Sequence, residues 1–447
     1  WQNPDIKILD PCLKSGVFLR EAAKRLMVGL EDKIKDEKKR REHIFTNMLY
    51  GIAITELTAL ISRRSLYYSK NADSKFSVYK FKNEEGNIIY KRSEHDFFAG
   101  KCNICGAIED KLERGEEFEN YAYSFIHEED VFKDMKFDIV IGNPPYQLDD
   151  AGFGRSAKAI YHLFVDQAFK LKPGYVSMII PSRWFVGGKL PKEFRERMLQ
   201  SKNFINLVDF PEAEDVFPGV TIRGGVCYFL YDKNYDGKCE IESYRKGELV
   251  SSSKRFLGEF GNIFIRHNEA LPIIKKVMKN ETKFMDKQVS TRNAFGMESN
   301  FFNYSDKKKP GSYKLYYKFG GEGWVNPKFV TKNNEWVHKY KVLSLAAYGT
   351  SGDYPYQVTS KPKIVNPGSV STETYLVCGV YDSEEEAKNL ESYLRTRFVR
   401  FLIYLRVITQ HIKPDSFSFV PIPDLSKNWT DKKLYEKYKI SNDEINF

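Results

Sequence analysis

The sequence predicts an α/β fold: a Rossmann-like, doubly wound and mostly parallel sheet, followed by a C-terminal mixed α/β domain. Short β-branched runs alternate with amphipathic helical segments through residues 1–230, the pattern of parallel strands joined by crossover helices. From residue 271 this alternation fades into aromatic segments broken by glycine and proline. We therefore expect a first domain at 1–270 and a second at 271–447.

The elements of the first domain follow from the same alternation. The expected strands are Ile6–Asp10, Leu49–Ile54, Phe137–Ile141, Tyr175–Ile180, Phe204–Asp209 and Val226–Tyr231. The expected helices, with apolar residues at helical spacing, are Val17–Leu30, Leu57–Tyr67 and Ala159–Lys172. Residues 71–134 are charged and interrupt the pattern, which predicts an insertion with a small structure of its own. In the second domain a helix is expected over Glu384–Thr409.

Composition narrows the class of protein. A chain of 447 residues with 42% hydrophobic and 29% charged residues has enough material for two packed domains. Six cysteines are too few for a disulfide scaffold, and no signal peptide or long apolar run is present. We expect a cytoplasmic protein without a membrane partner. Because Trp1 stands almost at the first expected strand, we also expect a fragment whose N-terminal part is missing.

Positive charge is concentrated in the second domain. The net charge is +10, and residues 271–447 hold 28 lysines and arginines against 19 acidic residues. Clustered cations favour phosphate contact, because binding releases the counterions of a nucleic acid. A basic surface that only keeps the protein soluble is the alternative. The chemistry of the first domain has to decide between the two.

That chemistry is concentrated in Asn143-Pro144-Pro145-Tyr146, which follows the expected strand Phe137–Ile141. The lone pair of an exocyclic amine on a purine is delocalised, so the nitrogen is a poor nucleophile. Two acceptors, the Asn143 side-chain oxygen and the Pro144 carbonyl, can localise that lone pair by binding the amino hydrogens. Successive prolines hold the acceptors in place, and Tyr146 offers a face for an extruded base. A strand end followed by a simple Pro-Pro turn is the alternative.

These residues resemble the amino-methyltransferases of DNA, in which Asn-Pro-Pro-Tyr marks enzymes that methylate adenine at N6. A cofactor loop before the catalytic loop, with a recognition region after both, is similar to the gamma group of restriction–modification systems. The resemblance implies S-adenosylmethionine as cofactor, double-stranded DNA as substrate, and a restriction endonuclease domain or subunit as partner. It rests on motifs in residues 6–231 and only on position beyond them.

The family's cofactor loop, Asp-Pro-x-x-Gly-Ser-Gly-x-Phe, resembles the segment that begins at Asp10. The matching residues, which the resemblance makes cofactor-binding, are Asp10, Pro11, Ser15, Gly16 and Phe18. Lys14 replaces the first glycine, so its side chain either disfavours the local backbone geometry or pairs with the cofactor carboxylate. Ala53 stands where the family has an acid for the ribose hydroxyls. Glu56, three residues later, is the expected substitute, or else a solvated or helix-capping glutamate.

Within the insertion, Cys102-Asn-Ile-Cys105 has the spacing of a zinc knuckle. A second such pair is absent, so the remaining ligands would be His95 and His127. A structural zinc ion would explain how a charged insertion folds. Two reduced thiols in a loop are the alternative.

The second domain is expected to recognise the DNA target. Charge comes from Lys307–Lys309, Arg395, Arg397, Arg400 and Arg406, and stacking surfaces from Tyr313, Tyr316, Tyr317 and Trp324. Two other functions remain open. One is a specificity module of a restriction endonuclease that binds S-adenosylmethionine and DNA with little or no methylation, which Lys14 and Ala53 favour. The other is methylation of another planar amine, in RNA or protein glutamine.

Overall fold

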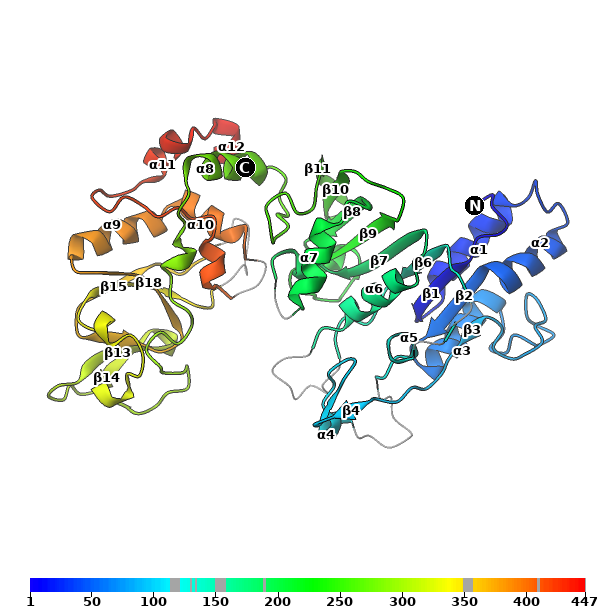
Figure 1. Cartoon of the computed structure of the whole chain (residues 1–447), viewed down its shortest axis with the longest axis horizontal. Helices are drawn as coiled ribbons and strands as arrows, with labels where there is room; N and C mark the ends of the chain where they lie inside the picture. Colours follow the sequence, from blue (N-terminus) through cyan, green and yellow to red (C-terminus); the bar gives the residue numbers. More distant parts are fainter. Residues whose placement is uncertain are drawn as a thin grey trace. The chain divides into compact units, whose positions relative to one another are not determined.

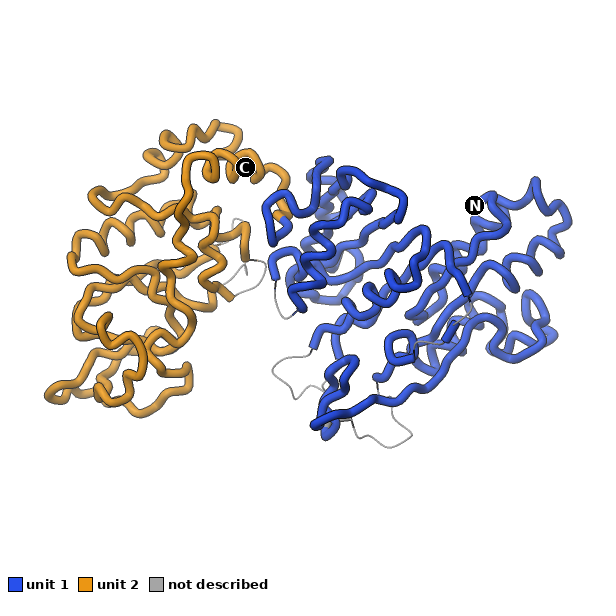
Figure 2. Tube along the Cα trace, viewed as in Figure 1, with its two compact units in different colours: residues 1–264 blue, residues 265–447 orange. Residues whose placement is uncertain are grey.

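The computed structural model of the chain describes residues 1–112, 121–128, 131–132, 135–148, 158–187, 190–348, 357–407 and 411–446. The chain divides into two compact units, Trp1–Phe264 and Ile265–Phe447 (Figure 2). Each unit has secondary structure and packed side chains of its own, and each is described separately below. No helix among the described residues is long and apolar enough to cross a membrane.

Unit 1 is built on a nine-stranded sheet in the order β11-β10-β8-β9-β7-β6-β1-β2-β3, counted over the described residues (Figure 1). Its strands are β1 (Ile8–Leu13), β2 (Leu49–Ala53), β3 (Ile88–Ile89), β6 (Ile139–Gly142), β7 (Tyr175–Pro181), β8 (Phe204–Phe210), β9 (Val226–Asp232), β10 (Cys239–Arg245) and β11 (Glu248–Arg255). β1 pairs in parallel with β2 and β6, and β6 pairs in parallel with β7. The expected mostly parallel α/β sheet is confirmed, with antiparallel pairs at β9 and β11.

Helices cover both faces of this sheet, because successive strand residues point to opposite sides. Ile8 packs with buried residues of α1 and α3, whereas the next residue, Leu9, packs with buried residues of α6 and α7. The sheet is therefore doubly wound around two core clusters. The helices of unit 1 are α1 (Val17–Gly29), α2 (Glu37–His43), α3 (Glu56–Tyr67), α4 (Glu109–Leu112), α5 (Ser124–His127), α6 (Tyr161–Lys170) and α7 (Lys192–Gln200), with short turns η1 (Ile44–Met48), η2 (Ser182–Phe185) and η3 (Ala213–Asp215).

The first strand runs later than the expected Ile6–Asp10. Pairing with β2 continues to Leu13, which lies opposite Ala53, and the register shifts between Asp10 and Leu13. Pro11 has no amide hydrogen to donate, so an irregularity at this position costs little pairing. The cofactor segment therefore begins inside a buried strand.

Residues 71–134 do not all stand apart from the sheet. Ala72, Phe81 and Ile88 are buried in the same cluster as α1 and α3, and β3 forms the edge of the large sheet. The rest includes a separate two-stranded sheet of β4 (Phe97–Phe98) and β5 (Lys101–Cys102). This part of the chain thus combines an edge strand of the sheet with a small hairpin.

Unit 2 contains a four-stranded sheet, β12-β14-β13-β17, and a three-stranded sheet, β16-β15-β18, within the described residues. Its strands are β12 (Tyr304–Ser305), β13 (Tyr313–Tyr317), β14 (Gly321–Val325), β15 (Tyr340–Leu345), β16 (Lys363–Val365), β17 (Ser369–Ser371) and β18 (Tyr375–Tyr381). Its helices are α8 (Ala270–Asn280), α9 (Glu384–Leu394), α10 (Arg397–Tyr404), α11 (Asp431–Tyr438) and α12 (Asn442–Asn446), with short turns η4 (Met285–Lys287), η5 (Lys318–Gly320), η6 (Pro327–Phe329), η7 (Asn334–Trp336) and η8 (Pro414–Phe417).

The single helix expected over Glu384–Thr409 is wrong. The chain forms α9 and α10 instead, because Thr396 has ψ of 147° and leaves helical geometry. Its side chain accepts the amide of Val399, which makes it the N-cap of the second helix. The expected end, Thr409, lies outside the described residues.

Candidate active site

The segment Asn143–Tyr146 follows β6 at the carboxyl end of the parallel strands, where β1 and β7 are the neighbours of β6. The side-chain oxygen Oδ1 of Asn143 is buried and has no hydrogen-bond partner among the residues that the structure describes. A buried acceptor without a donor costs about 1–3 kcal/mol. Such an atom at a strand end therefore indicates a ligand that supplies the donor.

The cofactor segment and the Asn143 segment lie against each other. A side-chain carbon on Gly142 would lie 2.6 Å from the Cys12 thiol and 3.4 Å from Oδ1 of Asp10. Only glycine leaves room for this approach. β1 and β6 therefore place the two sequence motifs side by side, as their order in the sheet requires.

The Asp10 side chain is buried, unlike those of Lys14 and Ser15 in the same loop. It is only 3% exposed, and its Oδ1 accepts the amide of Cys12 at 3.1 Å. Burial raises the pKa of this carboxyl to about 7, against the weaker lowering effect of its bonds to Cys12. Pro11 is also buried. These two residues brace the loop, while Lys14 and Ser15 are exposed.

Gly16 ends this loop at the N-cap of α1 with φ of 71°. A side chain there would be strained, and it would also meet the backbone of Ser62 in α3 at 3.1 Å. The Ser62 hydroxyl donates to the Lys14 carbonyl at 3.3 Å and so ties the loop to α3. Lys14 itself is not among the residues with positive φ, so the replacement of glycine by lysine does not strain the backbone.

The remaining expected cofactor residues lie at the ends of neighbouring helices. Phe18, in the first turn of α1, is 42% exposed. Glu56 is exposed and is the first residue of α3, after the N-cap Thr55, whose side chain accepts the amide of Thr58. Ala53 is only 3% exposed and packs in the apolar cluster of α1 and α3. Of the two positions, only Glu56 presents an accessible carboxylate.

Two buried aromatic residues of unit 1 with unpaired polar atoms, within the described residues, went unrecognised in the sequence. The ring of Tyr161, the first residue of α6, packs edge-on against Tyr146 with ring centroids 6.5 Å apart. The hydroxyls of both tyrosines are buried and lack a partner among the described residues, and burial raises the pKa of both. Trp184 is fully buried, and its indole N–H likewise has no hydrogen-bond partner among the described residues. Each stands in an apolar run, which offers no signal beyond core packing.

The four expected metal ligands come together. One ligand atom from each of His95, Cys102, Cys105 and His127 lies within 4.8 Å of the others. Cys102 Sγ lies 3.8 Å from His127 Nε2, and Cys105 Sγ lies 3.5 Å from His95 Nδ1. Two sulfur and two nitrogen donors in this arrangement suit a tetrahedral zinc ion.

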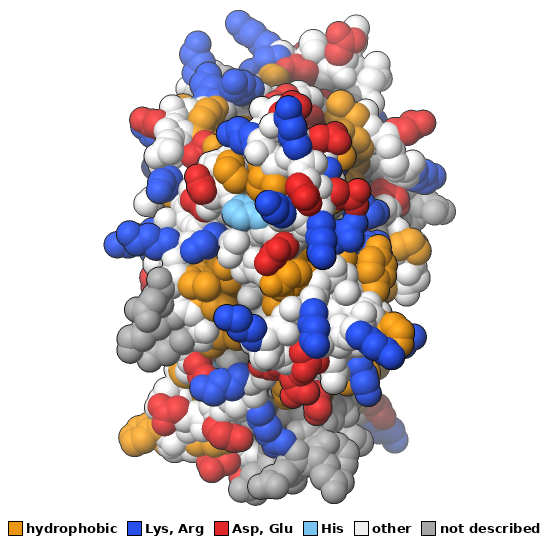
Figure 3. All heavy atoms as spheres, turned by 90° about the vertical axis from the view of Figure 1, so that its right-hand side faces the viewer, with side chains coloured by type: hydrophobic (Ala, Val, Ile, Leu, Met, Phe, Trp, Pro, Cys, Tyr) orange, Lys and Arg blue, Asp and Glu red, His pale blue; other side chains and the backbone are white. Residues whose placement is uncertain are grey.

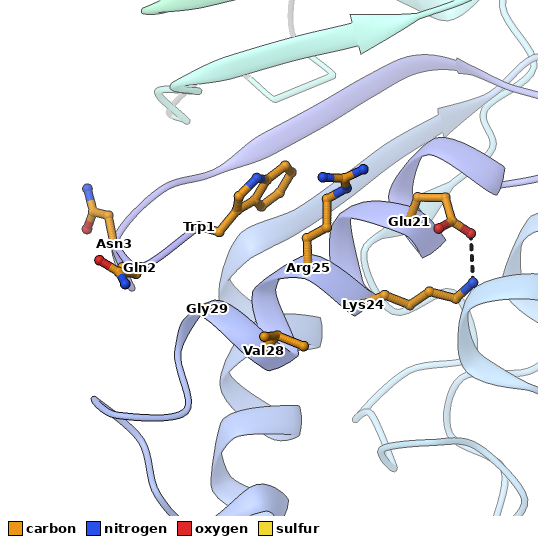
Figure 4. Close-up of a pocket in the computed structure, with 8 residues that line it drawn as sticks. All are labelled: Trp1, Gln2, Asn3, Glu21, Lys24, Arg25, Val28 and Gly29. Carbon is orange, nitrogen blue, oxygen red and sulfur yellow. Dashed lines mark hydrogen bonds and ion pairs between the residues drawn. The ribbon is translucent and has the colours of Figure 1, made fainter.

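A hollow at the other end of α1 contains none of the expected site residues (Figure 4). It is lined by Trp1, Gln2, Asn3, Glu21, Lys24, Arg25, Val28 and Gly29. Arg25 lies over the Trp1 ring at 5.8 Å, and Lys24 pairs with Glu21 at 2.8 Å. In the face shown in Figure 3, cationic and acidic side chains are interspersed. Neither the residues that line this hollow nor the mixed charges of that face indicate a charged catalytic cleft.

Several of the residues of unit 2 that were expected to contact DNA already pair with neighbouring side chains. Lys308 lies over the Trp324 ring at 5.1 Å, and Tyr317 stacks on Tyr304 with centroids 4.4 Å apart. Tyr316 is only 7% exposed, and the Lys363 ammonium lies over its ring at 4.3 Å. Arg395 pairs with Glu391 at 3.3 Å.

Three comparisons identify relatives. Residues 47–217 match the family described as Eco57I restriction-modification methylase. A protein of Mycoplasma pneumoniae (strain ATCC 29342 / M129 / Subtype 1), described as an uncharacterized adenine-specific methylase, is 39% identical over 290 residues, which are 58% of this chain and 68% of that protein. The chain belongs to the adenine-specific methylase family. The resemblance drawn from the sequence motifs is thereby confirmed at the level of family.

Solved structures agree with this family at the level of the fold. A nuclease-deletion mutant of the Type ISP restriction-modification enzyme LlaGI, in complex with a DNA substrate mimic, has a TM-score of 0.51 at 11% identity and covers 94% of this chain. The Type IIL enzyme MmeI, in complex with DNA, has a TM-score of 0.51 at 10% identity and covers 93%. This chain spans 50% and 62% of those two proteins. Members of the methylase family use S-adenosylmethionine.

Proposed function

We propose that this adenine-specific methylase transfers a methyl group from S-adenosylmethionine to N6 of adenine at specific sites in double-stranded DNA, as the modification part of a restriction–modification enzyme. The observation that carries the proposal is the buried Oδ1 of Asn143, which lies beside the loop of Asp10 and has no hydrogen-bond partner within the described part of the chain. The order of the two loops before unit 2 also suits the gamma group.

The catalytic residues are Asn143, Pro144, Pro145 and Tyr146. The Asn143 side chain and the Pro144 carbonyl accept the two hydrogens of the adenine amine, which localises the nitrogen lone pair. The two prolines keep both acceptors in place before the base arrives. Tyr146 stacks on the extruded base, and Tyr161 supports the Tyr146 ring from the side. These roles need no charged side chain.

The cofactor residues are Asp10, Pro11, Ser15, Gly16, Phe18 and Glu56. S-adenosylmethionine supplies an electrophilic methyl group on a sulfonium. The residues fit this group, because Gly16 lets the loop close against the Ser62 backbone of α3, and Ser15 and Glu56 are both exposed. The Glu56 carboxylate accepts hydrogen bonds from the ribose hydroxyls in place of an acid at Ala53.

Residues 1–270 form the catalytic domain and residues 271–447 recognise the DNA target. The support for DNA as partner is the charge of 28 cations against 19 acids in 271–447 and the pairing of Lys308 with Trp324. Related folds are known from proteins in complex with DNA. A restriction endonuclease domain or subunit is the second proposed partner.

One observation favours a second function, a specificity module that binds S-adenosylmethionine and DNA with little or no methylation. Residue 53, at the end of β2, is a buried alanine where the resembling family has an acid for the ribose hydroxyls. In that case cofactor and DNA would bind together without methyl transfer.

We also propose that the chain holds one structural zinc ion through His95, Cys102, Cys105 and His127. Tetrahedral bonds to sulfur and nitrogen separate these atoms by about 3.5 Å, and the Cys105–His95 distance is 3.5 Å. The other ring nitrogen of His127 donates to the Tyr123 carbonyl at 3.0 Å, which orients the ring as second-shell partners of metal ligands do. Elemental analysis should find about one zinc per chain, lost in Cys102→Ser and kept in Cys239→Ser.

The methylation proposal is tested with Asn143→Ala in the full chain. Single-turnover methyl transfer to mixed-sequence DNA should fall by about 100-fold or more, as for loss of one transition-state acceptor. The dissociation constant for S-adenosylmethionine should stay within about threefold. Asn234→Ala, an exposed residue of unit 1, is the matched control. Wild-type binding of cofactor and DNA without transfer would favour the specificity module, and equal loss of both properties would make Asn143 structural.

A further inference from the structure

The His/Cys cluster and the Asn143 segment are connected in the fold through Lys158 and through α6. Gly106, in the turn after Cys105, has φ of 67°, and the Lys158 ammonium occupies the space into which a side chain on Gly106 would extend. Lys158 therefore lies directly on the turn that carries two of the cluster's ligands.

Lys158 is also joined to the catalytic segment through its backbone. Its carbonyl accepts the amide of Leu148 at 2.9 Å, and the amide of Ile160 donates to the Tyr146 carbonyl at 3.2 Å. Gln147 and Ala159 pair as an antiparallel bridge between these two bonds. The residues that follow Tyr146 are thus held by the short stretch that begins at Lys158.

A second connection runs through aromatic side chains. His127 is the last residue of α5, and two other side chains of this region, Tyr123 and Phe125, pack on Phe164 of α6 with centroids 5.6 and 6.0 Å apart. α6 begins with Tyr161, whose ring supports Tyr146. Both connections lead from the cluster to Tyr146.

The cofactor loop is held by different contacts. Leu13 and Leu19, on either side of that loop, are buried in the cluster of α1 and α3. Of the cofactor segment, Cys12 belongs to the core cluster on the other face of the sheet, which holds Cys102, Cys105, Leu148 and Tyr161. Ser62, which binds the Lys14 carbonyl, also comes from α3. Loosening the His/Cys cluster should therefore loosen the Asn143 segment and leave most of the cofactor loop in place.

We propose that metal bound at His95, Cys102, Cys105 and His127 holds the catalytic segment in place, so that occupancy of this site controls methyl transfer without controlling cofactor binding. This inference rests on the proposed zinc site and on the proposed methylation. Lys158 is a positioning residue: it acts through Leu148 and does not touch the substrate. Because metal and folding are coupled in small metal-bound hairpins, loss of the ion releases Gly106 and α5 from both connections.

Hydrogen exchange of the full chain, with zinc bound and after chelation, tests the coupling without relying on catalysis. Metal removal should speed exchange at the amides of Leu148 and Ile160 by about tenfold or more, equivalent to about 1.4 kcal/mol of lost protection. Exchange at Arg20 and Ile54, whose amides donate to the carbonyls of Gly16 and Leu13 in the cofactor segment, should change by less than about twofold. Readdition of zinc should restore the first pair.

Methyl transfer gives the second readout. The stripped protein should lose about tenfold in single-turnover rate and keep its affinity for S-adenosylmethionine within about threefold. Lys158→Ala should keep its zinc and still lower the rate, whereas Lys170→Ala, at the exposed end of α6, should change neither. Cys102→Ser should behave as the stripped protein and Cys239→Ser as the wild type.

The outcomes separate this inference from the proposals beneath it. A chain that binds no zinc overturns it together with the zinc site and leaves methylation untouched. Zinc removal that leaves Leu148 and Ile160 unchanged, or that speeds exchange equally at the cofactor loop, overturns the coupling alone. Selective exchange at the catalytic segment in a chain that transfers no methyl group supports the coupling and contradicts the proposed methylation.

Discussion

The Cys12 thiol lies 2.6 Å from the point to which a side chain on Gly142 would extend. Cys12 belongs to the cofactor segment and Gly142 immediately precedes Asn143, so this contact sets the spacing between the two loops. The thiol is buried, and its pKa is raised by burial and by the adjacent Asp10 carboxyl, which keeps it protonated and uncharged at neutral pH. It acts here as a small apolar side chain.

Gly142→Ala should therefore push the two loops apart. Overpacking of this kind costs about 1–3 kcal/mol, so the melting temperature should fall and methyl transfer should drop with it. Because the nearest obstacle is the Cys12 thiol, a side-chain atom, Gly142→Ala combined with Cys12→Ala should recover most of the lost stability. Cys12→Ala alone serves as control. Failure of the double variant to recover would mean that the backbone of β1, not the thiol, limits this approach.

Asp10 should make the stability of the protein depend on pH in an unusual direction. Burial raises its folded pKa to about 7 from 3.8, so the folded state binds this proton more tightly than the unfolded state. The contribution is fully present below about pH 4 and is lost as pH rises to about 7, with an upper bound of about 4 kcal/mol. Asp10→Asn keeps an acceptor for the Cys12 amide and cannot ionise.

The measurement is the difference in melting temperature between Asp10→Asn and wild type at several pH values. The variant should gain on the wild type as pH rises from 4.5 to 7.5 and show no further gain above that range. Other titrating groups cancel in this difference. A constant difference would show that the Asp10 carboxyl titrates at its ordinary pKa.

Glu56 should carry the cofactor contact that Ala53 cannot make. Glu56→Gln removes the charge and keeps the shape, so the affinity for S-adenosylmethionine should fall by about tenfold, the value of one charge-assisted hydrogen bond. Isothermal titration of the full chain measures it. Glu21→Gln, in α1 and beside the hollow of Figure 4, should have no effect. Equal affinity of wild type and Glu56→Gln would leave Glu56 as a helix-terminal residue.

Sequence patterns predicted the parallel sheet because buried strands and crossover helices have distinct periods. They misplaced β1, since a strand can continue past Pro11 through an irregular register, and they missed the break at Thr396, since apolar residues at helical spacing continue across it. The Cys102–Cys105 spacing identified two of the four ligands in the His/Cys cluster. The other two, His95 and His127, lie 7 and 22 residues away, and they were inferred only because a tetrahedral site needs four ligands. Tyr161 had no signal, because its position depends on how α6 packs.

The Tyr146 ring and its hydroxyl should contribute differently. The hydroxyl is buried without a partner among the described residues, and burial raises its pKa, so it stays neutral. Tyr146→Phe removes an unsatisfied polar atom and should keep methyl transfer while raising stability by up to about 1 kcal/mol. Tyr146→Ala removes the stacking face, which is worth about 1–3 kcal/mol per base. Its single-turnover rate should therefore fall by about tenfold or more, with cofactor affinity retained.

A fluorescent adenine analogue at the target position separates base binding from chemistry in these variants. Tyr146→Phe should give the wild-type signal on DNA binding, and Tyr146→Ala should give a smaller one, because an extruded base without a stacking partner returns to the duplex. Tyr161→Ala should resemble Tyr146→Ala in part, since it removes the ring that supports Tyr146. If instead Tyr146→Phe loses transfer as fully as Tyr146→Ala, the hydroxyl takes part in the reaction and must turn toward the base when DNA binds.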